Sequence, residues 1–116
     1  MATFKLSLSS RHKEWRRFRI RIMCELQDQS GQRTGFVTAE GTATGVCELA
    51  TGECRRIRTF IYAIPDSLPA ERTVERCPDF PAHLRVECGG RTIADETLAI
   101  NQWGGTSIER TFDSLG

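Results

Sequence analysis

Residues 17–26, RFRIRIMCEL, hold the feature that most constrains this chain, an alternation of hydrophobic and polar side chains. A period of two residues puts successive side chains on opposite faces of an extended strand, whereas an amphipathic helix needs a period near 3.6. The face predicted to be buried holds Phe18, Ile20, Ile22, Cys24 and Leu26, and the face predicted to be wet holds Arg17, Arg19, Arg21 and Glu25. Such a strand is typical of an antiparallel sheet.

Further short segments of this kind follow. The pattern predicts strands over 34–40, 45–49, 55–64, 83–88, 91–100 and about 107–112. Gly89-Gly90 separates two of them and predicts a hairpin, because both glycines tolerate a positive φ. No segment sustains a long helical period.

One short helix is predicted around residues 68–77, where Pro69 suits a first helical turn. The N-terminal arm, 1–14, alternates at Phe4, Leu6 and Leu8, which leaves an extra strand there open. We therefore predict one all-β domain over residues 1–116, an antiparallel β-barrel or β-sandwich of six to seven strands.

The composition fits a small globular domain. With 116 residues, 39% of them hydrophobic and 27% charged, one core is expected. No apolar run approaches the roughly 20 residues of a membrane span, and the alternating start lacks the apolar core of a signal peptide. Five cysteines without an export signal suggest free thiols, so we expect a cytoplasmic protein.

The stretch ATGVCELATGEC, 43–54, nearly repeats itself and holds two of the cysteines. A turn at Thr51-Gly52 would make it a hairpin, with Cys47 and Cys54 diagonal to each other and too far apart for an unstrained disulfide. A slipped register would leave a cross-strand disulfide open. Spacings of 23, 7, 23 and 11 do not fit a zinc site, so buried free thiols are the favoured interpretation.

No motif of an active site is present, such as a nucleophile elbow, a phosphate loop or a zinc-protease helix. His12 and His83 lack a recognisable partner, and Asp95-Glu96 lies in a predicted strand, where an exposed face or a bend explains it better than paired catalytic acids. We therefore expect a chain that is not an enzyme and that holds no cofactor and no metal.

The charge distribution favours a binding module. Residues 1–33 hold eight Lys or Arg and three acids, whereas residues 34–116 hold eight and twelve, and fourteen of the sixteen basic residues are Arg. An arginine face suits an acidic partner protein or the acidic half of a second copy. We take Arg16, Arg17, Arg19 and Arg21 as that face. Trp103, on a predicted loop, is either an interface anchor or a lid on the core.

One resemblance to a known family suggests a ligand. Arg17-Phe18-Arg19-Ile20-Arg21 has the spacing R-x-x-x-R beside Arg16, and Glu40-Gly41-Thr42-Ala43-Thr44-Gly45 is a relaxed D/N-x-S-x-x-G. Over about residues 11–50 the chain resembles the PilZ domains, which are six-stranded β-barrels that in many cases bind cyclic di-GMP. The resemblance implies that Arg17 and Arg21 hold phosphates and guanine faces, that Glu40 and Thr42 contact a base edge, and that Gly45 forms a tight turn.

Single-stranded nucleic acid is a further alternative. Arg56 and Arg58 could extend the arginine face, with Trp15 and Tyr62 as stacking side chains. The acidic remainder of the chain argues against it, so nucleic acid is an unlikely partner, and no membrane contact is expected.

Overall fold

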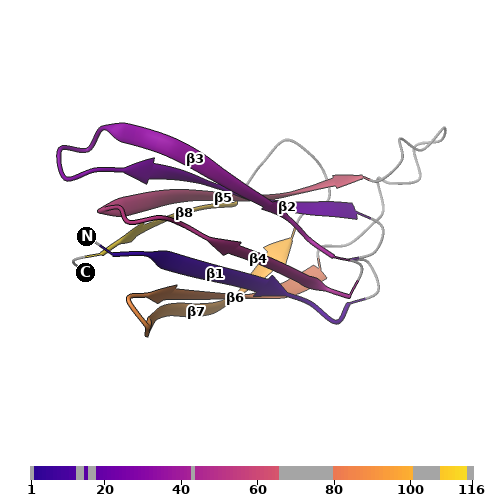
Figure 1. Cartoon of the computed structure of the whole chain (residues 1–116). Coiled ribbons are helices and arrows are strands. Elements are labelled where there is room, and N and C mark those ends of the chain that lie inside the picture. Colours follow the sequence, from indigo (N-terminus) through magenta and orange to yellow (C-terminus); the bar gives the residue numbers. More distant parts are fainter. Residues whose placement is uncertain are drawn as a thin grey trace.

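The computed structural model describes residues 2–12, 15, 18–42, 44–65, 80–100 and 108–114, and all elements in these ranges are strands. They form two four-stranded antiparallel sheets that pack face to face (Figure 1), in the orders β4-β1-β6-β7 and β3-β2-β5-β8. The strands are β1 Phe4–Ser9, β2 Phe18–Gln27, β3 Arg33–Glu40, β4 Val46–Ala50, β5 Arg56–Pro65, β6 Phe80–Cys88, β7 Arg91–Ile100 and β8 Ile108–Asp113. The predicted all-β class is confirmed, and the sheets form a sandwich.

The alternation that predicted β2 is confirmed within this strand. Ile20, Ile22, Cys24 and Leu26 are buried between the sheets, while Arg19 and Arg21 lie on the outer side. β2 pairs with β3 on one side and with β5 on the other, so it is an internal strand. Burial of its aliphatic row is what fixes its register, because a slip by one residue would turn every arginine inward.

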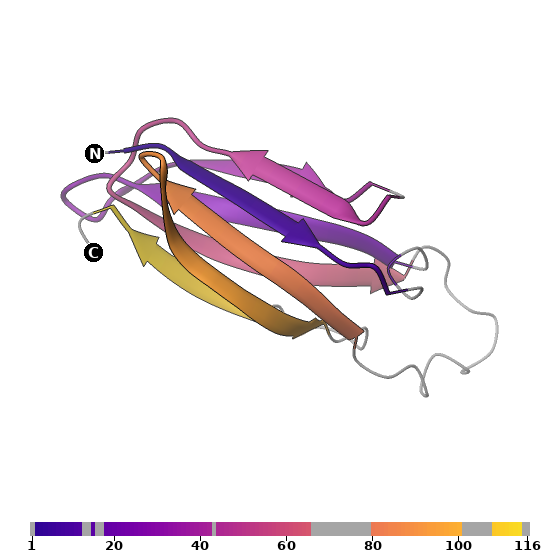
Figure 2. The same ribbon diagram turned by 90° about the horizontal axis from the view of Figure 1, so that it is seen from below.

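The N-terminal arm supplies a strand that the second sheet needs. Phe4, Leu6 and Leu8 are buried, and β1 pairs with both β4 and β6 in the middle of its sheet. The described residues thus hold eight strands, more than the six or seven predicted. The helix predicted around 68–77 lies outside the described residues. Figure 2 shows that β1 begins and β8 ends at the same end of the sandwich.

Two of the turns follow from local residue choice. Gly89 and Gly90 have φ of 58° and 85° and join β6 to β7, which confirms the predicted hairpin. Between β2 and β3, one carboxylate oxygen of Asp28 accepts hydrogen bonds from the backbone N–H groups of Ser30 and Gln32. Both connections join neighbours within one sheet.

The predicted hairpin over 43–54 is wrong, because β4 and β5 belong to different sheets. The connection between them is attached to β1: the Thr51 N–H donates to the Phe4 carbonyl, and the Phe4 N–H donates to Thr51 Oγ1 at 3.0 Å. Cys54 then pairs with Ala2. These bonds carry the chain across the end of the sandwich instead of back along β4.

The prediction of buried free thiols is confirmed for the described cysteines. Cys24, Cys47, Cys54 and Cys88 are buried and unpaired, and Cys77 lies outside the described residues. Burial raises the pKa of the Cys24 and Cys47 thiols to about 11. Both thiols therefore behave as small hydrophobic side chains of the core at neutral pH.

Candidate functional site

The outer side of the β3-β2-β5-β8 sheet combines arginines with aromatic side chains. Residues directly opposite each other on antiparallel strands share one face, so the register places Arg21 beside Tyr62 and Met23 beside Phe60. We call this surface the arginine–aromatic face. Its members are Arg19, Arg21, Met23 and Glu25 on β2, Arg33, Phe36, Thr38 and Glu40 on β3, Arg56, Arg58, Phe60 and Tyr62 on β5, and Glu109 on β8.

Three guanidinium groups on this face stack over rings. The Arg33 guanidinium carbon lies 4.8 Å from the Phe36 ring centre, that of Arg58 5.1 Å from Phe60, and that of Arg21 5.9 Å from Tyr62. Arg33 reaches the outer side because the β2–β3 register shifts between Leu26 and Gln27. Such contacts hold both partners in place and leave flat, partly polar surfaces facing outward.

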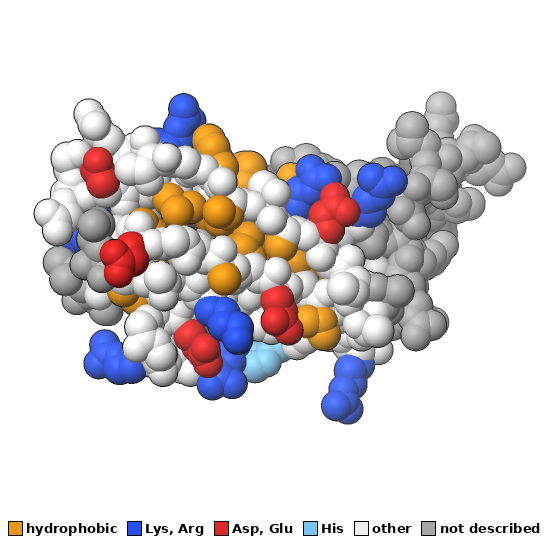
Figure 3. Space-filling model, in the orientation of Figure 1, with side chains coloured by type: hydrophobic (Ala, Val, Ile, Leu, Met, Phe, Trp, Pro, Cys, Tyr) orange, Lys and Arg blue, Asp and Glu red, His pale blue; other side chains and the backbone are white. Residues whose placement is uncertain are grey.

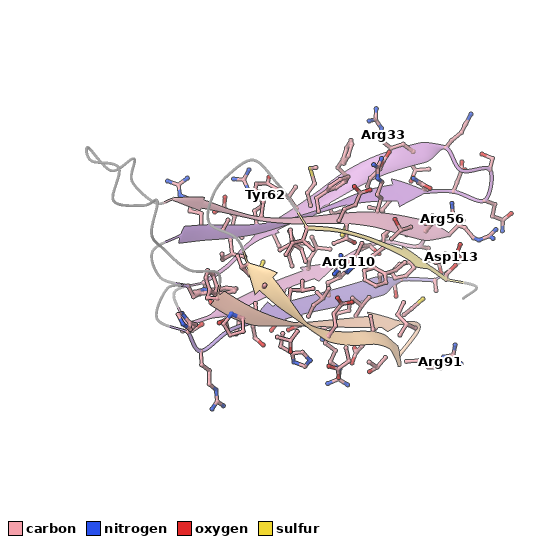
Figure 4. All side chains as sticks on the ribbon, turned by 180° about the vertical axis from the view of Figure 1, so that it is seen from behind. Arg33, Arg56, Tyr62, Arg91, Arg110 and Asp113 are labelled. Atoms are coloured by element: carbon pink, nitrogen blue, oxygen red, sulfur yellow. The ribbon has the colours of Figure 1, made fainter. Side chains whose placement is uncertain are left out.

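Two of these arginines, Arg21 and Arg58, are also paired with acids. Arg21 Nη2 lies 2.6 Å from Glu40 Oε1, and Arg58 Nε lies 2.6 Å from Glu109 Oε1. The hydrogen bond from Arg21 lowers the pKa of the Glu40 carboxyl below its ordinary value. Arg56 lies 3.1 Å from Asp113, and Figure 4 shows this pair at one end of the sheet. The face thus alternates charge instead of presenting an uncompensated cationic strip.

The structure brings together part of the predicted site. Arg21 and Glu40, which sequence reasoning assigned to two separate motifs, are directly opposite each other on β2 and β3. Arg19 is exposed on the same face as Arg21. Arg16, Arg17 and Trp103 lie outside the described residues.

Thr42 and Gly45 lie in the turn between β3 and β4. Thr42 Oγ1 lies 2.6 Å from Thr44 Oγ1 and donates to the Val46 carbonyl. Gly45 has a φ of 93°, and a Cβ there would lie 2.2 Å from the Ser10 carbonyl oxygen. A glycine is therefore required at position 45, because the chain at the end of β1 comes too close to this turn to leave room for a Cβ.

Trp15 is a core residue and not the exposed stacking side chain that the nucleic-acid alternative needs. It is 3% exposed, and its indole N–H donates to the Thr42 carbonyl at 2.7 Å. Its ring fills the space beside Gly41, where a Cβ would lie 2.7 Å from it. A Trp next to a charged segment gave no sign of this burial, because its covering partners come from distant strands.

Phe36 is the feature that sequence reasoning missed. It is 49% exposed, and among the described residues it is the exposed large hydrophobic side chain. It lies on β3, an edge strand that pairs with β2 alone in the described part of the chain. Figure 3 shows hydrophobic side chains along the flank between β3 and β4, where Val37 and Ala39 are half-buried against the core. The alternation in residues 34–40 puts Phe36 and Val37 on opposite faces of the strand. This pattern was the sign in the sequence that one of the two hydrophobic side chains would be exposed.

The remaining candidate groups are dispersed. Asp95 and Glu96 point to opposite sides of β7: the Asp95 carboxylate contacts the His83 ring, whereas Glu96 binds Arg110 of β8 at 3.1 Å. They cannot act as paired acids. Within the described ranges, no three His, Cys, Asp or Glu side chains gather as a metal site. The described residues also contain no helix long and apolar enough to cross a membrane.

Comparison with known proteins adds a likeness of fold. No family model and no curated protein matches the chain. A solved structure, an NMR structure of the calcium-bound form of a protein from Parabacteroides distasonis, is similar with a TM-score of 0.61 and 13% sequence identity. The match covers 97% of this chain and 92% of that one. At this identity the likeness concerns the fold alone.

Proposed function

We propose that this chain is a non-enzymatic, self-associating binding module whose contact surface is the arginine–aromatic face together with the β3 edge. The exposure of Phe36 on an edge strand carries the proposal, because a large hydrophobic side chain beside unpaired backbone groups favours strand pairing with another chain. The buried, unpaired cysteines fit a reducing compartment such as the cytoplasm.

The composition of the surface supports a protein contact. Arg, Tyr, Phe and Met are enriched where proteins bind each other, and all four occur on this face. Stacking on rings already holds Arg21, Arg33 and Arg58 in place, and pairing with acids adds to this for Arg21 and Arg58. Less side-chain freedom is then lost on association, which favours affinity.

A second copy of the chain fits the edge by strand register and charge. Pairing two antiparallel copies of β3 about Val37 sets Phe36 of each copy opposite Thr38 of the other, with the two Phe36 rings diagonal and within aromatic reach. The same register brings Glu40 of each copy beside the Arg33–Thr34 end of the other. A two-fold axis makes every such contact occur twice.

The test is the oligomeric state of the purified chain and of two matched variants. We expect sedimentation to show dimer growing between about 1 μM and about 1 mM, the range of weak protein contacts. Phe36→Lys should remain monomeric. Ala50→Lys places the same charge on the exposed edge strand of the other sheet and should dimerise like the wild type.

Two results would contradict the proposal. A wild-type chain that stays monomeric throughout this concentration range would rule out self-association, and the binding partner of the surface would then be a different protein. Dimerisation of Phe36→Lys at wild-type concentrations would place the contact elsewhere on the molecule.

Nucleotide binding is the second candidate function, and one observation favours it. Arg21 and Glu40, both part of the PilZ-like motifs, lie together at 2.6 Å. A guanine base could accept from Arg21 and donate to Glu40 if it displaced the link between them. Calorimetry with cyclic di-GMP tests this candidate function. Heat of binding that is seen with the wild type and lost in Arg21→Ala would support a PilZ-like receptor. Absence of binding heat with the wild type would exclude nucleotide binding.

A further inference from the structure

A hollow of about 510 Å³ lies on the sheet opposite the arginine–aromatic face, at the end where β1 stops and β6 starts. Four parts of the chain meet there: the end of β1, the turn before β4, the start of β6 and the middle of β7. The described residues that line it are Ser9, Ser10, Arg11, Thr44, Gly45, Val46, Pro81, Ala82, His83 and Thr97.

The lining is rich in hydrogen-bond donors and, among the described residues, contains no acid. Four hydroxyl groups, one guanidinium and one imidazole surround the space. A second hollow on the same sheet differs, because there Lys5 and Arg85 face Glu48 and Glu87 and the charges cancel. In the first hollow the Asp95 carboxylate lies behind the His83 ring, and Arg11 is the cationic group that faces the convergent hydroxyls, which suits an anion.

Part of the lining is held in place and part is free for a ligand. Ser10 Oγ donates to the Pro81 carbonyl at 2.7 Å, and the Asp95 carboxylate orients the His83 ring. Ser9 lies directly opposite His83 on the neighbouring strand. Within the described part of the chain, no side-chain partner occupies the Arg11 guanidinium or the Ser9 and Thr97 hydroxyls, so these groups can serve a ligand.

We infer that this hollow binds the phosphate group of a small phosphate monoester. Arg11 supplies the charge and a two-pronged donor, and the hydroxyls of Ser9 and Thr97 supply single donors for the other oxygens. Its volume falls within the range of about 300 to 1,000 Å³ for small-molecule pockets, which leaves room for an organic body beside the phosphate.

NMR titration of the ¹⁵N-labelled chain at fixed pH and ionic strength tests this inference. Inorganic phosphate and glycerol 3-phosphate should each cause saturable shifts of the Ser10, Gly45 and His83 amides, with glycerol 3-phosphate binding at least as tightly. Acetate, a planar anion, should bind more weakly than both. Arg11→Gln should weaken phosphate binding about tenfold or more, since hydrogen bonds between charged groups are the strong ones.

Arg91→Gln is the matched control. Arg91 is exposed at the β6–β7 turn, at the far end of the same sheet (Figure 4), and its loss changes the net charge equally. Its phosphate affinity should stay within about twofold of the wild type, because charges beyond about 10 Å are screened. Equal weakening by both variants would mean that phosphate follows net charge, and failure of glycerol 3-phosphate to bind would exclude an ester site. Either result overturns the inference.

Discussion

At the scale of single residues, the site is set by close approaches that local sequence patterns do not reveal. Arg21 and Glu40 are nineteen positions apart, and they meet because the β2–β3 register makes them neighbours. Alternation predicts which side of a strand each residue takes. It does not predict which acid faces which arginine, because that depends on register and on the shift at Gln27.

Gly45 offers a sharp test of one such approach. We expect Gly45→Ala to destabilise the fold by about 1–3 kcal/mol or more, because the φ of 93° is strained for alanine and the added Cβ would strike the Ser10 carbonyl. Gly52→Ala is the control, with open space around the added Cβ and no positive φ. Urea unfolding of both variants checks this, and a Gly45→Ala protein as stable as Gly52→Ala would show that the turn does not approach Ser10.

The buried thiols predict a pH dependence of stability. The pKa of Cys24 and Cys47 is about 11 in the folded chain, against an ordinary value of 9.0. A raised folded pKa means that the stabilisation is complete below pH 9 and is lost as pH rises toward 11. The free energy of unfolding, measured by urea at pH 8 to 11, should therefore fall, and it should fall less in Cys24→Ala. A decline of equal size in both proteins would contradict this assignment.

At the scale of elements, strands were more predictable than the paths between them. A hydrophobic row such as Ile20, Ile22 and Cys24 indicates a strand whichever strands it pairs with in the sheet. Gly89-Gly90 indicates a turn by itself, because both glycines adopt a positive φ. The segment 43–54 carries an equally plausible turn signal, yet it crosses between sheets. The bonds to Phe4 and Ala2 that direct it come from the distant N-terminus, which local pattern cannot include.

The crossover from β4 to β5 should depend on Thr51. Its buried hydroxyl accepts from the Phe4 N–H, so Thr51→Val leaves that donor unsatisfied and should cost about 1–3 kcal/mol. Glu53→Ala, an exposed neighbour, should change stability little. Chemical denaturation of the two variants compares them. Equal stability of Thr51→Val and the wild type would imply that the hydroxyl does not anchor this connection.

At the scale of the whole molecule, the charge asymmetry of the sequence is compensated within the fold. Basic residues of the first third face acids that come later, as Arg21 faces Glu40, while Arg58 lies near Glu25 of the first third. Ion pairs therefore link the basic segment 1–33 (eight basic and three acidic residues) with the acidic remainder 34–116 (eight and twelve) within the described residues. What distinguishes the surface is alternating charge around the exposed Phe36 ring and the half-buried Phe60 and Tyr62 rings, a pattern that a copy of the same chain can complement.

Self-association through this surface should weaken as salt is added. In the proposed dimer, contacts between Arg33 and Glu40 of opposite copies would be exposed, so screening would reduce their attraction, whereas contact between the Phe36 rings would persist. Sedimentation at rising sodium chloride should show a gradual loss of dimer and not an abrupt one. Dimer that strengthens with salt would indicate an apolar contact without the charge pairing.

Hydrogen exchange of the β3 backbone amides tests the central claim most directly, because strand pairing protects the groups that face outward at an edge. We predict that amides of 33–40 that do not bond to β2 exchange more slowly at high protein concentration than at low concentration. Amides at the edges formed by β4, β7 and β8 should exchange at the same rate in both samples. Concentration-independent exchange along β3, or new protection at another edge, would contradict the account.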